Sequence, residues 1–365
     1  MSRAVFETAT LADAIRKAAR FAPTKGAELD KAGGIVIDLS DPVDTPLADI
    51  RSTDLRVFYR QTIRPIELTI TRTSWRVSSV LLEAVTSRLP MGLGSTVTLY
   101  DEQNSLHIQA GKVKAKLNLI DDEVPFPEWE PFDPFGLSVV ENFAQRVSQV
   151  RWATDTKANN VLSGVHIDGQ QLIATDGKCA VRVPLECPLA APVTAPLSEL
   201  IELIKDHPEV ALRATSESLE VMPDQDTQVR VVLLKGEYPN VAIVIDNPMV
   251  EHLTTEKGPL LAAIDRLLAL DSSDRFPVMR MLFDGSSLEM KREVPDIGWI
   301  NEELELETLV PFYEMWVNPI LLRNMLQNTS HNEVELAWGA DSLSPFKVSD
   351  GTGYEVVGLP RRKTA

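Results

Sequence analysis

The sequence predicts an α+β protein made of three tandem copies of one module, each with helices packed on antiparallel sheets. Two observations predict this fold class. Short amphipathic helices recur about 120 residues apart, and each is followed by three short strands in the same order. Helices that alternate with antiparallel meanders, rather than with single buried parallel strands, indicate the α+β class.

The repeated helices have apolar residues at i, i+3 and i+4, which is typical of a short helix packed on one face. They lie at Val80–Val85, Leu200–Ile204 and Ile320–Leu326. Each copy also opens with a second helix candidate. These candidates are Leu11–Phe21, Val139–Trp152 and Leu260–Leu270.

The segments after each repeated helix alternate apolar and polar residues and are separated by Gly, Asp or Ser turns. Such period-2 runs predict antiparallel meanders. The predicted strands are 95–99, 105–108 and 114–119 in the first copy, 209–212, 218–221 and 228–233 in the second, and 333–338, 345–348 and 354–357 in the third.

Proline-rich joins mark the module boundaries. The first join is Pro125–Pro131, and the second runs from Tyr238 to Pro248. We therefore expect domains at 1–131, 132–247 and 248–365. Since solenoid repeats are about 20–50 residues long, this longer period indicates tandem domains.

Composition indicates a soluble globular chain and argues against DNA binding by charge alone. The 365 residues are 44% hydrophobic and 24% charged, and 36 Lys and Arg against 53 Asp and Glu give a net charge of −17. A protein that holds phosphates by charge is basic. The two cysteines, the absence of a signal-like start and the lack of a long apolar run predict a cytoplasmic protein.

Chemical motifs are scarce, and we expect no catalytic residue, metal or cofactor. The phosphate-binding glycine motifs are absent, and the five histidines are scattered without ligand spacing. Cys179 is more typical of a small buried thiol than of a nucleophile. The run Glu302–Glu307 alternates Glu and Leu and predicts a strand with one wet face rather than a metal site.

Asp176 has two interpretations. It follows an apolar strand and precedes Gly177 and Lys178, so it could be the nucleophile of a cytosolic hydrolase. However, Thr53 and Asp54 stand at the corresponding point of the first copy. A Thr-Asp pair at the same place in two copies favours a structural turn, in which the Asp carboxylate bonds the backbone ahead of it.

Recognisable motifs occur along nearly the whole chain. The clearest are Ala153–Asp155, Val161–Val165 and Leu172–Gly177. The others are Ser52–Leu55, Asp122–Glu128, Gly236–Pro239, Asn318–Leu322, Leu343–Phe346 and Val356–Arg362. In this order and spacing, the motifs resemble bacterial-type DNA polymerase sliding clamps, the polymerase III β subunits, and the first three resemble the opening of the family's middle domain.

The resemblance implies a non-enzymatic ring around duplex DNA, made of two chains joined head to tail with helices inside and sheets outside. A closed ring holds DNA by topology, so an acidic exterior is compatible with it. The implied partners are double-stranded DNA, the replicative polymerase, a clamp loader and a second copy of the chain. The basic residues expected to face DNA are Arg16, Lys17, Arg20, Arg88, Arg146, Arg151, Lys157, Lys205, Arg266 and Arg323.

The resemblance also implies an apolar groove between the middle and third domains that binds short client peptides. The matching positions are Leu162, Thr175, Gly177, Lys178, Cys179, Ala180, Pro239, Ile243, Val244, Val357, Leu359, Pro360 and Arg361. The family usually has His-Arg-Leu where this chain has Lys178-Cys179-Ala180, and often has Arg at Ile243. These differences predict an altered client motif.

Two positions near the family's ring-closing contact, Ala115 and Asp271, are usually bulky and apolar. Such drift is typical of a bacteriophage or secondary clamp. One alternative stays open, an adaptor that keeps the peptide groove without encircling DNA.

Overall fold

The computed structural model describes residues 1–23, 32–42, 45–120, 125–127, 136–158, 160–186, 189, 191–271, 273–274 and 277–362. Residues 128–131 of the predicted first join, residues 122–124 of the Asp122–Glu128 motif, Cys187 and the tail 363–365 lie outside the described residues. The chain divides into two compact units. One unit is Met1–Glu141 with Asp206–Leu233, and the other is Asn142–Lys205 with Leu234–Ala365.

The first module confirms the predicted helices and meander. Its elements are β1 (Arg3–Glu7), α1 (Thr8–Ala19), β2 (Ile35–Ser40), β3 (Leu47–Thr53), β4 (Val57–Ile63), β5 (Glu67–Thr69), β6 (Ser74–Val77), α3 (Ser79–Thr86), β7 (Thr96–Glu102), β8 (Ser105–Ala110) and β9 (Val113–Asn118). Leu11, Ile15 and Ala18 of α1 are fully buried at the spacing of one helix face. Burial of each large side chain contributes about 1.5–3 kcal/mol, which fixes α1 beside α3 and on the strands β3 and β4.

The second module has a similar element order, and its strands are divided between the two units. Its elements are β10 (Ser138–Glu141), α4 (Phe143–Val150), η2 (Arg151–Ala153), η3 (Val161–Ser163), β11 (Val165–Ile167), β12 (Gln171–Thr175), β13 (Cys179–Pro184), β14 (Val193–Ala195), η4 (Leu197–Leu200), α5 (Ile201–Ile204), β15 (Glu209–Ala214), β16 (Ser218–Asp224), β17 (Thr227–Val232) and α6 (Ala242–Ile245). Strands β10 and β15–β17 belong to the first unit, whereas β11–β14 belong to the second.

The predicted helix Val139–Trp152 was wrong at its start. Residues Ser138–Glu141 form β10, which pairs with β15 in antiparallel register, Val140 opposite Val210. Asn142 then has a left-handed backbone with φ of 57°, which ends the strand before α4 begins at Phe143. The β-branched residues Val139 and Val140 are extended because β15 supplies their backbone hydrogen bonds. The local sequence does not reveal this partner strand.

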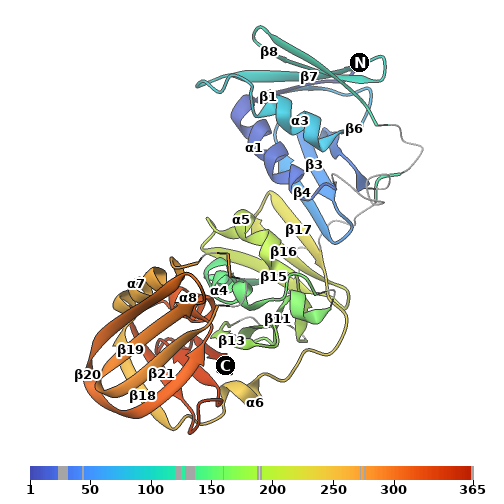
Figure 1. The fold of residues 1–365 in the computed structure, drawn as a ribbon. Helices are drawn as coiled ribbons and strands as arrows, with labels where there is room; N and C mark the ends of the chain where they lie inside the picture. The colour runs from blue at the N-terminus through green and yellow to red at the C-terminus, as the bar shows by residue number, and fades with distance from the viewer. Residues whose placement is uncertain are drawn as a thin grey trace. The chain divides into compact units, whose positions relative to one another are not determined.

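The third module contains β18 (Glu251–Glu256), α7 (Lys257–Leu268), β19 (Met279–Val294), β20 (Gly298–Val317), α8 (Pro319–Gln327), β21 (Glu333–Trp338), β22 (Phe346–Ser349) and β23 (Glu355–Gly358). Helices α7 and α8 pack beside each other (Figure 1). Within β20, Leu306 is buried while Glu303 and Glu305 are exposed, which confirms a strand with one wet face.

The long strand β19 reverses direction at Gly285. An extended chain rises about 3.3 Å per residue, so nine residues would span about 30 Å, yet Arg280 and Glu289 form an ion pair. Gly285 has a φ of 61°. Residues 279–283 pair with 313–317 of β20, whereas 287–294 pair with 298–305. The two long strands therefore consist of four segments, 279–283, 287–294, 298–305 and 313–317.

Sheets continue from one module into the next. One eight-stranded sheet has the order β10-β15-β16-β17-β4-β3-β2-β6, and the other has the order β14-β11-β12-β13-β23-β22-β21-β18. The seams are the antiparallel pairs β17–β4 and β13–β23. Backbone hydrogen bonds therefore join neighbouring modules. No helix in the described part of the chain is long and apolar enough to cross a membrane.

A buried arginine closes the end of α7. Arg292 on β19 is 1% exposed. Its guanidinium donates to the carbonyl oxygens of Leu267 and Asp271, at 3.1 Å each. It also donates to the Asp274 carboxylate at 3.2 Å. A cation at a helix C-terminus is favourable because the last carbonyls lack helical partners.

We expect Arg292→Met to lower the free energy of unfolding by about 3–5 kcal/mol, because it leaves buried carbonyls without a donor. Urea denaturation followed by circular dichroism measures this change. The matched control is Arg323→Met, whose ion pair with Asp265 is largely exposed, and we expect about 0–1 kcal/mol there. Equal losses in the two variants would contradict the structural role of Arg292.

Candidate functional site

Most of the residues expected in the peptide groove line one cavity of about 230 Å³ in the second unit. The cavity lies between the β12–β13 turn, the segment around α6 and the end of β23. Its lining is Leu162, Thr175, Gly177, Lys178, Cys179, Ala180, Pro239, Asn240, Val241, Val244 and Leu359. We call this cavity the client groove.

The turn beside the client groove is built by Thr175 and Asp176. The Asp176 carboxylate accepts hydrogen bonds from the backbone N–H groups of Lys178 and Cys179, at 2.8 and 3.0 Å. The Thr175 hydroxyl accepts one from Gly177 N at 3.0 Å. Gly177 has a φ of 80°. Asp176 is therefore a turn residue in this geometry, as the structural interpretation predicted.

The first module contains the same turn. Asp54 accepts from the N–H groups of Arg56 and Val57, at 2.9 and 2.7 Å. Thr53 accepts from Leu55 N at 2.9 Å. The repeat of this hydrogen-bond set in two modules leaves Asp176 without a distinctive catalytic arrangement.

Small side chains form the floor of the client groove. Cys179 lies opposite Gly358 and Ala180 opposite Val357 across the β13–β23 seam. Ala180 belongs to one buried apolar cluster with Val357, Ile173, Val241 and Ile245. Val357 is 1% exposed, so this expected site residue supports the floor instead of lining the cavity.

Cys179 is a buried thiol, as expected from the sequence. Burial, followed by the nearby Asp176 carboxylate, raises the pKa of Cys179 well above its usual range. Such a thiol stays protonated and is a poor nucleophile.

Helix α6 supplies a wall of the client groove, and its start was missed from sequence. The Asn240 side chain, just before the N-cap residue Val241, accepts a hydrogen bond from Ala242 N, the first residue of α6, at 3.2 Å. Asn240 and Val241 both line the cavity. An Asn directly before an apolar run was the available signal. Ile243, by contrast, is 73% exposed and lies outside the lining.

Charged residues fix the far end of α6. Lys347 donates to the carbonyl oxygen of Ile245 at 3.3 Å and forms an ion pair with Glu355. Arg182 contacts both Asp246 and Glu355 at 2.5 Å. Burial alone would lower the pKa of Arg182, but its bonds to Asp246 and Glu355 raise it above the usual value.

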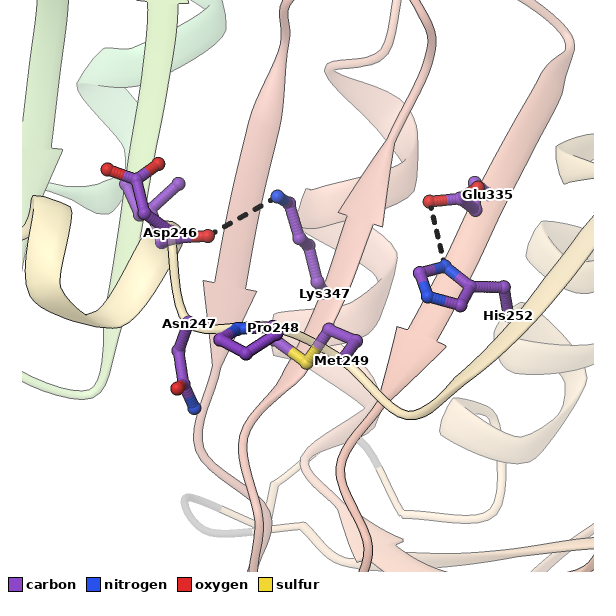
Figure 2. A pocket seen from close by; sticks show the side chains of 8 residues that line it. Asp246, Asn247, Pro248, Met249, His252, Glu335 and Lys347 are labelled. Atoms are coloured by element: carbon purple, nitrogen blue, oxygen red, sulfur yellow. Dashed lines mark hydrogen bonds and ion pairs between the residues drawn. The ribbon is translucent and has the colours of Figure 1, made fainter.

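A second cavity of about 420 Å³ lies beside this end of α6. Figure 2 shows Lys347 reaching toward the chain at Asp246, and His252 facing Glu335 across two strands. The distance from His252 Nδ1 to Glu335 Oε1 is 3.3 Å. Each charged residue of this cavity therefore has a partner, His252 with Glu335, Lys347 with Glu355 and Asp246 with Arg182.

The C-terminal segment completes the client groove. Leu359 N donates to Lys178 O at 3.1 Å, and the Leu359 side chain is 45% exposed within the cavity lining. Arg361 N donates to Trp316 O at 2.6 Å. Arg361 is therefore bonded to β20, and neither Pro360 nor Arg361 lines the cavity. A Cβ on Gly358 would lie 2.8 Å from Phe346, so this close approach needs glycine.

The ten basic residues expected to face DNA lie on or beside the helices, and half of them are ion-paired. Arg16 and Lys17 pair with Asp13, Lys205 with Glu202, Arg266 with Glu302 and Arg323 with Asp265. Partial burial raises the pKa of Asp13, but hydrogen bonds from Lys17 and Arg16 hold it below the usual value.

Of the other five, two have neutral partners. Arg88 donates to Ala84 O at 2.6 Å and Arg146 to Gln149 at 3.2 Å. Arg20, Arg151 and Lys157 are exposed, and no ion pair between described residues includes them. Nor do the described residues contain a group of three or more His, Cys, Asp or Glu arranged to hold a metal.

Comparison with known proteins finds a similar sequence. No protein-family model matches the chain. The beta sliding clamp of Synechococcus elongatus is 25% identical over 296 residues, which cover 74% of this chain and 78% of that protein.

Solved structures match the whole fold. The DNA polymerase III β subunit of Thermotoga maritima has a TM-score of 0.86 at 18% identity, with 100% of both chains covered. The sliding clamp of Bacillus subtilis has a TM-score of 0.87 at 18% identity, again over 100% of both chains. The sliding clamp of Caulobacter crescentus gives 0.84 at 19% identity over 99% of each chain.

The sequence match and the full-length fold match agree with the three-module pattern and with the motifs that bound the groove. By its fold the chain is similar to DNA polymerase III β subunits, and by sequence it is similar to a beta sliding clamp.

Proposed function

We propose that this chain is a non-enzymatic DNA sliding clamp that encircles duplex DNA as a dimeric ring and tethers the replicative polymerase through the client groove. The observation that carries the proposal is the pattern of sheet seams. Two pairs of neighbouring modules are joined by strand pairing within the chain. The first and third modules each keep a strand at the equivalent position for pairing with another copy. We also propose domains at 1–131, 132–247 and 248–365, a clamp loader as partner and a cytoplasmic location.

The seams repeat one rule. In each module, the third strand after the first helix pairs with the last strand of the next module. Strand β4 pairs with β17 in this way, and β13 pairs with β23. In the third module that third strand is segment 298–305 of β20. In the first module the last strand is β9, an edge of its sheet. The same rule applied between two copies pairs 298–305 of one with β9 of the other.

Charge supports this pairing. The exposed side chains of β9 include Lys114 and Lys116, whereas those of segment 298–305 include Glu303 and Glu305. Opposite charges on facing strands stabilise a sheet, while like charges destabilise it. Two β9 edges, or two β20 edges, would meet with like charges, so the charges favour head-to-tail assembly.

The client groove fits a short peptide with a bulky apolar anchor. The small side chains of Cys179 and Ala180 leave room above the floor, and Leu359 and Val244 supply apolar walls. Burial of one Leu or Phe side chain contributes about 1.5–3 kcal/mol. Two anchors, less ordering costs, suit a micromolar contact of roughly −8 kcal/mol that exchanges readily.

A second candidate function is an adaptor that binds client peptides without encircling DNA. The small Ala115 and the charged Asp271 at the ring-closing positions favour it. Oligomeric state separates the candidates, since a ring requires a dimer.

For ring closure, we expect Lys114→Glu combined with Lys116→Glu to weaken the dimer about tenfold, because like charges then face each other. Native mass spectrometry over a concentration series measures this. Adding Glu303→Lys and Glu305→Lys to the same chain should restore the dimer. The matched control, Arg56→Glu with Arg64→Glu, makes the same charge change at exposed positions away from both edges. A monomeric parent chain would favour the adaptor.

For DNA, we expect Arg20→Gln, Arg151→Gln and Lys157→Gln together to shorten the lifetime on nicked circular DNA about tenfold near 0.1 M salt, since three phosphate contacts are lost. The control triple variant is Lys205→Gln, Arg266→Gln and Arg323→Gln, whose charges are already paired with acidic residues. Linearising the DNA should release the parent ring. Retention on linear DNA without blocked ends would contradict encirclement.

For the client groove, we expect Leu359→Asp to weaken binding of an acetylated hexapeptide containing Leu and Phe at least tenfold, since a carboxylate replaces an apolar wall. Fluorescence anisotropy with a labelled peptide measures this. Ile243→Asp is the control, because Ile243 is exposed on the same helix outside the cavity. Loss of binding in the control alone would place the peptide elsewhere.

A further inference from the structure

The edge strand of the third module keeps large apolar side chains exposed. Among the described residues, segment 298–305 of β20 pairs only with segment 287–294 of β19. Trp299 on this edge is 63% exposed, and Ile300 is half-buried. A strand edge with exposed apolar side chains is a template for pairing with another strand. The register of such a pairing decides which side chains of a partner cover them.

Hydrogen bonds to the ends of two helices align β19 with β3. Ser52 on β3 donates to the carbonyl oxygen of Ala18 at 2.6 Å. Arg292 on β19 donates to the carbonyl oxygen of Leu267 at 3.1 Å. Each acceptor is the last residue but one of a 12-residue helix, α1 in the first module and α7 in the third. Ser52 and Arg292 therefore hold equivalent positions in their modules.

The neighbouring strands are aligned by the same equivalence. Ser52 lies opposite Tyr59 on β4, and Arg292 lies opposite Ile300 on β20. Ile300 therefore has the position in the third module that Tyr59 has in the first. Tyr59 is fully buried at its seam, whereas the strand of Ile300 has an unpaired edge among the described residues.

A hydrogen bond at the end of each strand aligns β9 with β17. Leu119 N donates to Asn104 O at 3.1 Å, and Leu233 N donates to Glu217 O at 2.9 Å. Each donor is the first residue after its strand. The two strands therefore correspond residue by residue, counted back from these donors.

This correspondence gives the register between two copies. Ala115 of β9 has the position of Val229 of β17, and Val229 lies opposite Tyr59 at the first seam. Since Ile300 has the position of Tyr59, the same register sets Ile300 of one copy opposite Ala115 of the other. Lys116 of that second copy then lies opposite Trp299.

The pair that corresponds to this contact is fully buried at both seams within the chain. At the first seam it is Tyr59 with Val229. At the second seam, counted from the same Thr-Asp turn, it is Val181 with Val356. All four side chains have no exposure, whereas the two residues at the open edges are only half-buried in the single chain. Closure between copies removes this remaining apolar surface from water, which is favourable.

The sizes of the two side chains suit this contact. At the first seam Val232 N donates to Arg56 O. The alternation of antiparallel bonds then makes the buried pair at this seam a non-hydrogen-bonded one, in which the side chains are closest. A small Ala115 leaves room there for the larger Ile300. The small residue at position 115 is thus compatible with ring closure, because the opposite strand supplies the bulk.

The indole of Trp299 offers the second contact. Lys291 Nζ lies 5.4 Å from the centroid of the indole ring, and Glu293 balances its charge at 3.1 Å. Most of the indole surface stays exposed in spite of this contact. The aliphatic stem of Lys116 from a second copy covers that surface while its ammonium group stays in water. Trp299 therefore favours the lysine-bearing edge β9 over a second acidic edge.

We infer that two copies close in one register, which sets Ile300 against Ala115 on the core-facing side of the joined sheet and Trp299 against Lys116 on the solvent-facing side. This inference rests on the proposed ring and names the contacts that hold it. The opposite charges of the two edges support the direction of pairing, whereas the apolar pair and the indole fix the register.

Cysteine cross-linking tests the register. Ala115→Cys and Ile300→Cys in one chain place two thiols opposite each other between copies, within disulfide distance. We expect oxidation by diamide to give a covalent dimer at least about tenfold faster than in the shifted pair, Val113→Cys with Ile300→Cys. Non-reducing gel electrophoresis measures both rates. The parent chain and each single variant are the controls for disulfides that involve the native cysteines.

Size exchange tests the core-facing contact. Ile300→Ala should weaken the dimer about tenfold, because apolar burial between copies is lost. Adding Ala115→Ile to that chain should restore the dimer to within about threefold of the parent. Native mass spectrometry over a concentration series measures both changes. The control is Leu309→Ala, since Leu309 is 82% exposed on β20 outside the paired segment.

Trp299→Gln tests the solvent-facing contact. We expect it to weaken the dimer about fivefold. Circular dichroism should stay unchanged, because the indole is exposed in the single chain.

The outcomes separate the register from the ring. A dimer that cross-links faster through the shifted pair overturns the register and leaves the ring intact. A dimer as strong in Ile300→Ala and in Trp299→Gln as in the parent overturns the two contacts. A parent chain that stays monomeric at every concentration overturns the ring and this inference together.

Discussion

Antiparallel pairing of strands from neighbouring modules is the constraint on which the rest of this structure depends. At the β4–β17 seam, Val57 and Val231 are paired residues with no exposure. At the β13–β23 seam, Ala180 and Val357 are paired and buried. Buried backbone groups must be hydrogen-bonded, so each seam strand needs its neighbour. For this reason the middle module divides between the two compact units instead of forming one of its own.

The same Thr-Asp turn lies beside each of these two seams. A Thr and an Asp bind the backbone ahead of them, and the next residue is left-handed. Each turn lies next to the C-terminal end of the following module, because Arg56 O accepts from Val232 N and Lys178 O accepts from Leu359 N. The side chains on this shared backbone differ between the two seams, as Gly177 against Leu55 and Ala180 against Phe58.

Acidic and basic residues have different roles in different parts of the chain. Acidic residues outnumber basic ones strongly, and several helical cations are already matched by carboxylates, as Arg266 is by Glu302. A protein that must slide gains from weak phosphate contact, because strong contact would hold it in place. Arg20, Arg151 and Lys157 are consistent with this demand, since they are few and exposed. At the strand edges, by contrast, the opposite charges of β9 and segment 298–305 support the head-to-tail pairing that we propose.

The sequence by itself determined the repeat, the helix and meander order, the structural role of Asp176 and most of the groove lining. These depend on local signals: apolar spacing, turn residues, and motifs in a constant order. Only the tertiary structure decided that Val139 belongs to a strand, that β19 turns at Gly285, and that Val357 lies beneath the groove while Val241 lines it. Each of these depends on which distant strand becomes the partner. Strand pairing forms between segments far apart in sequence, so a local pattern that is compatible with both a helix and a strand is resolved only when the partner is in place.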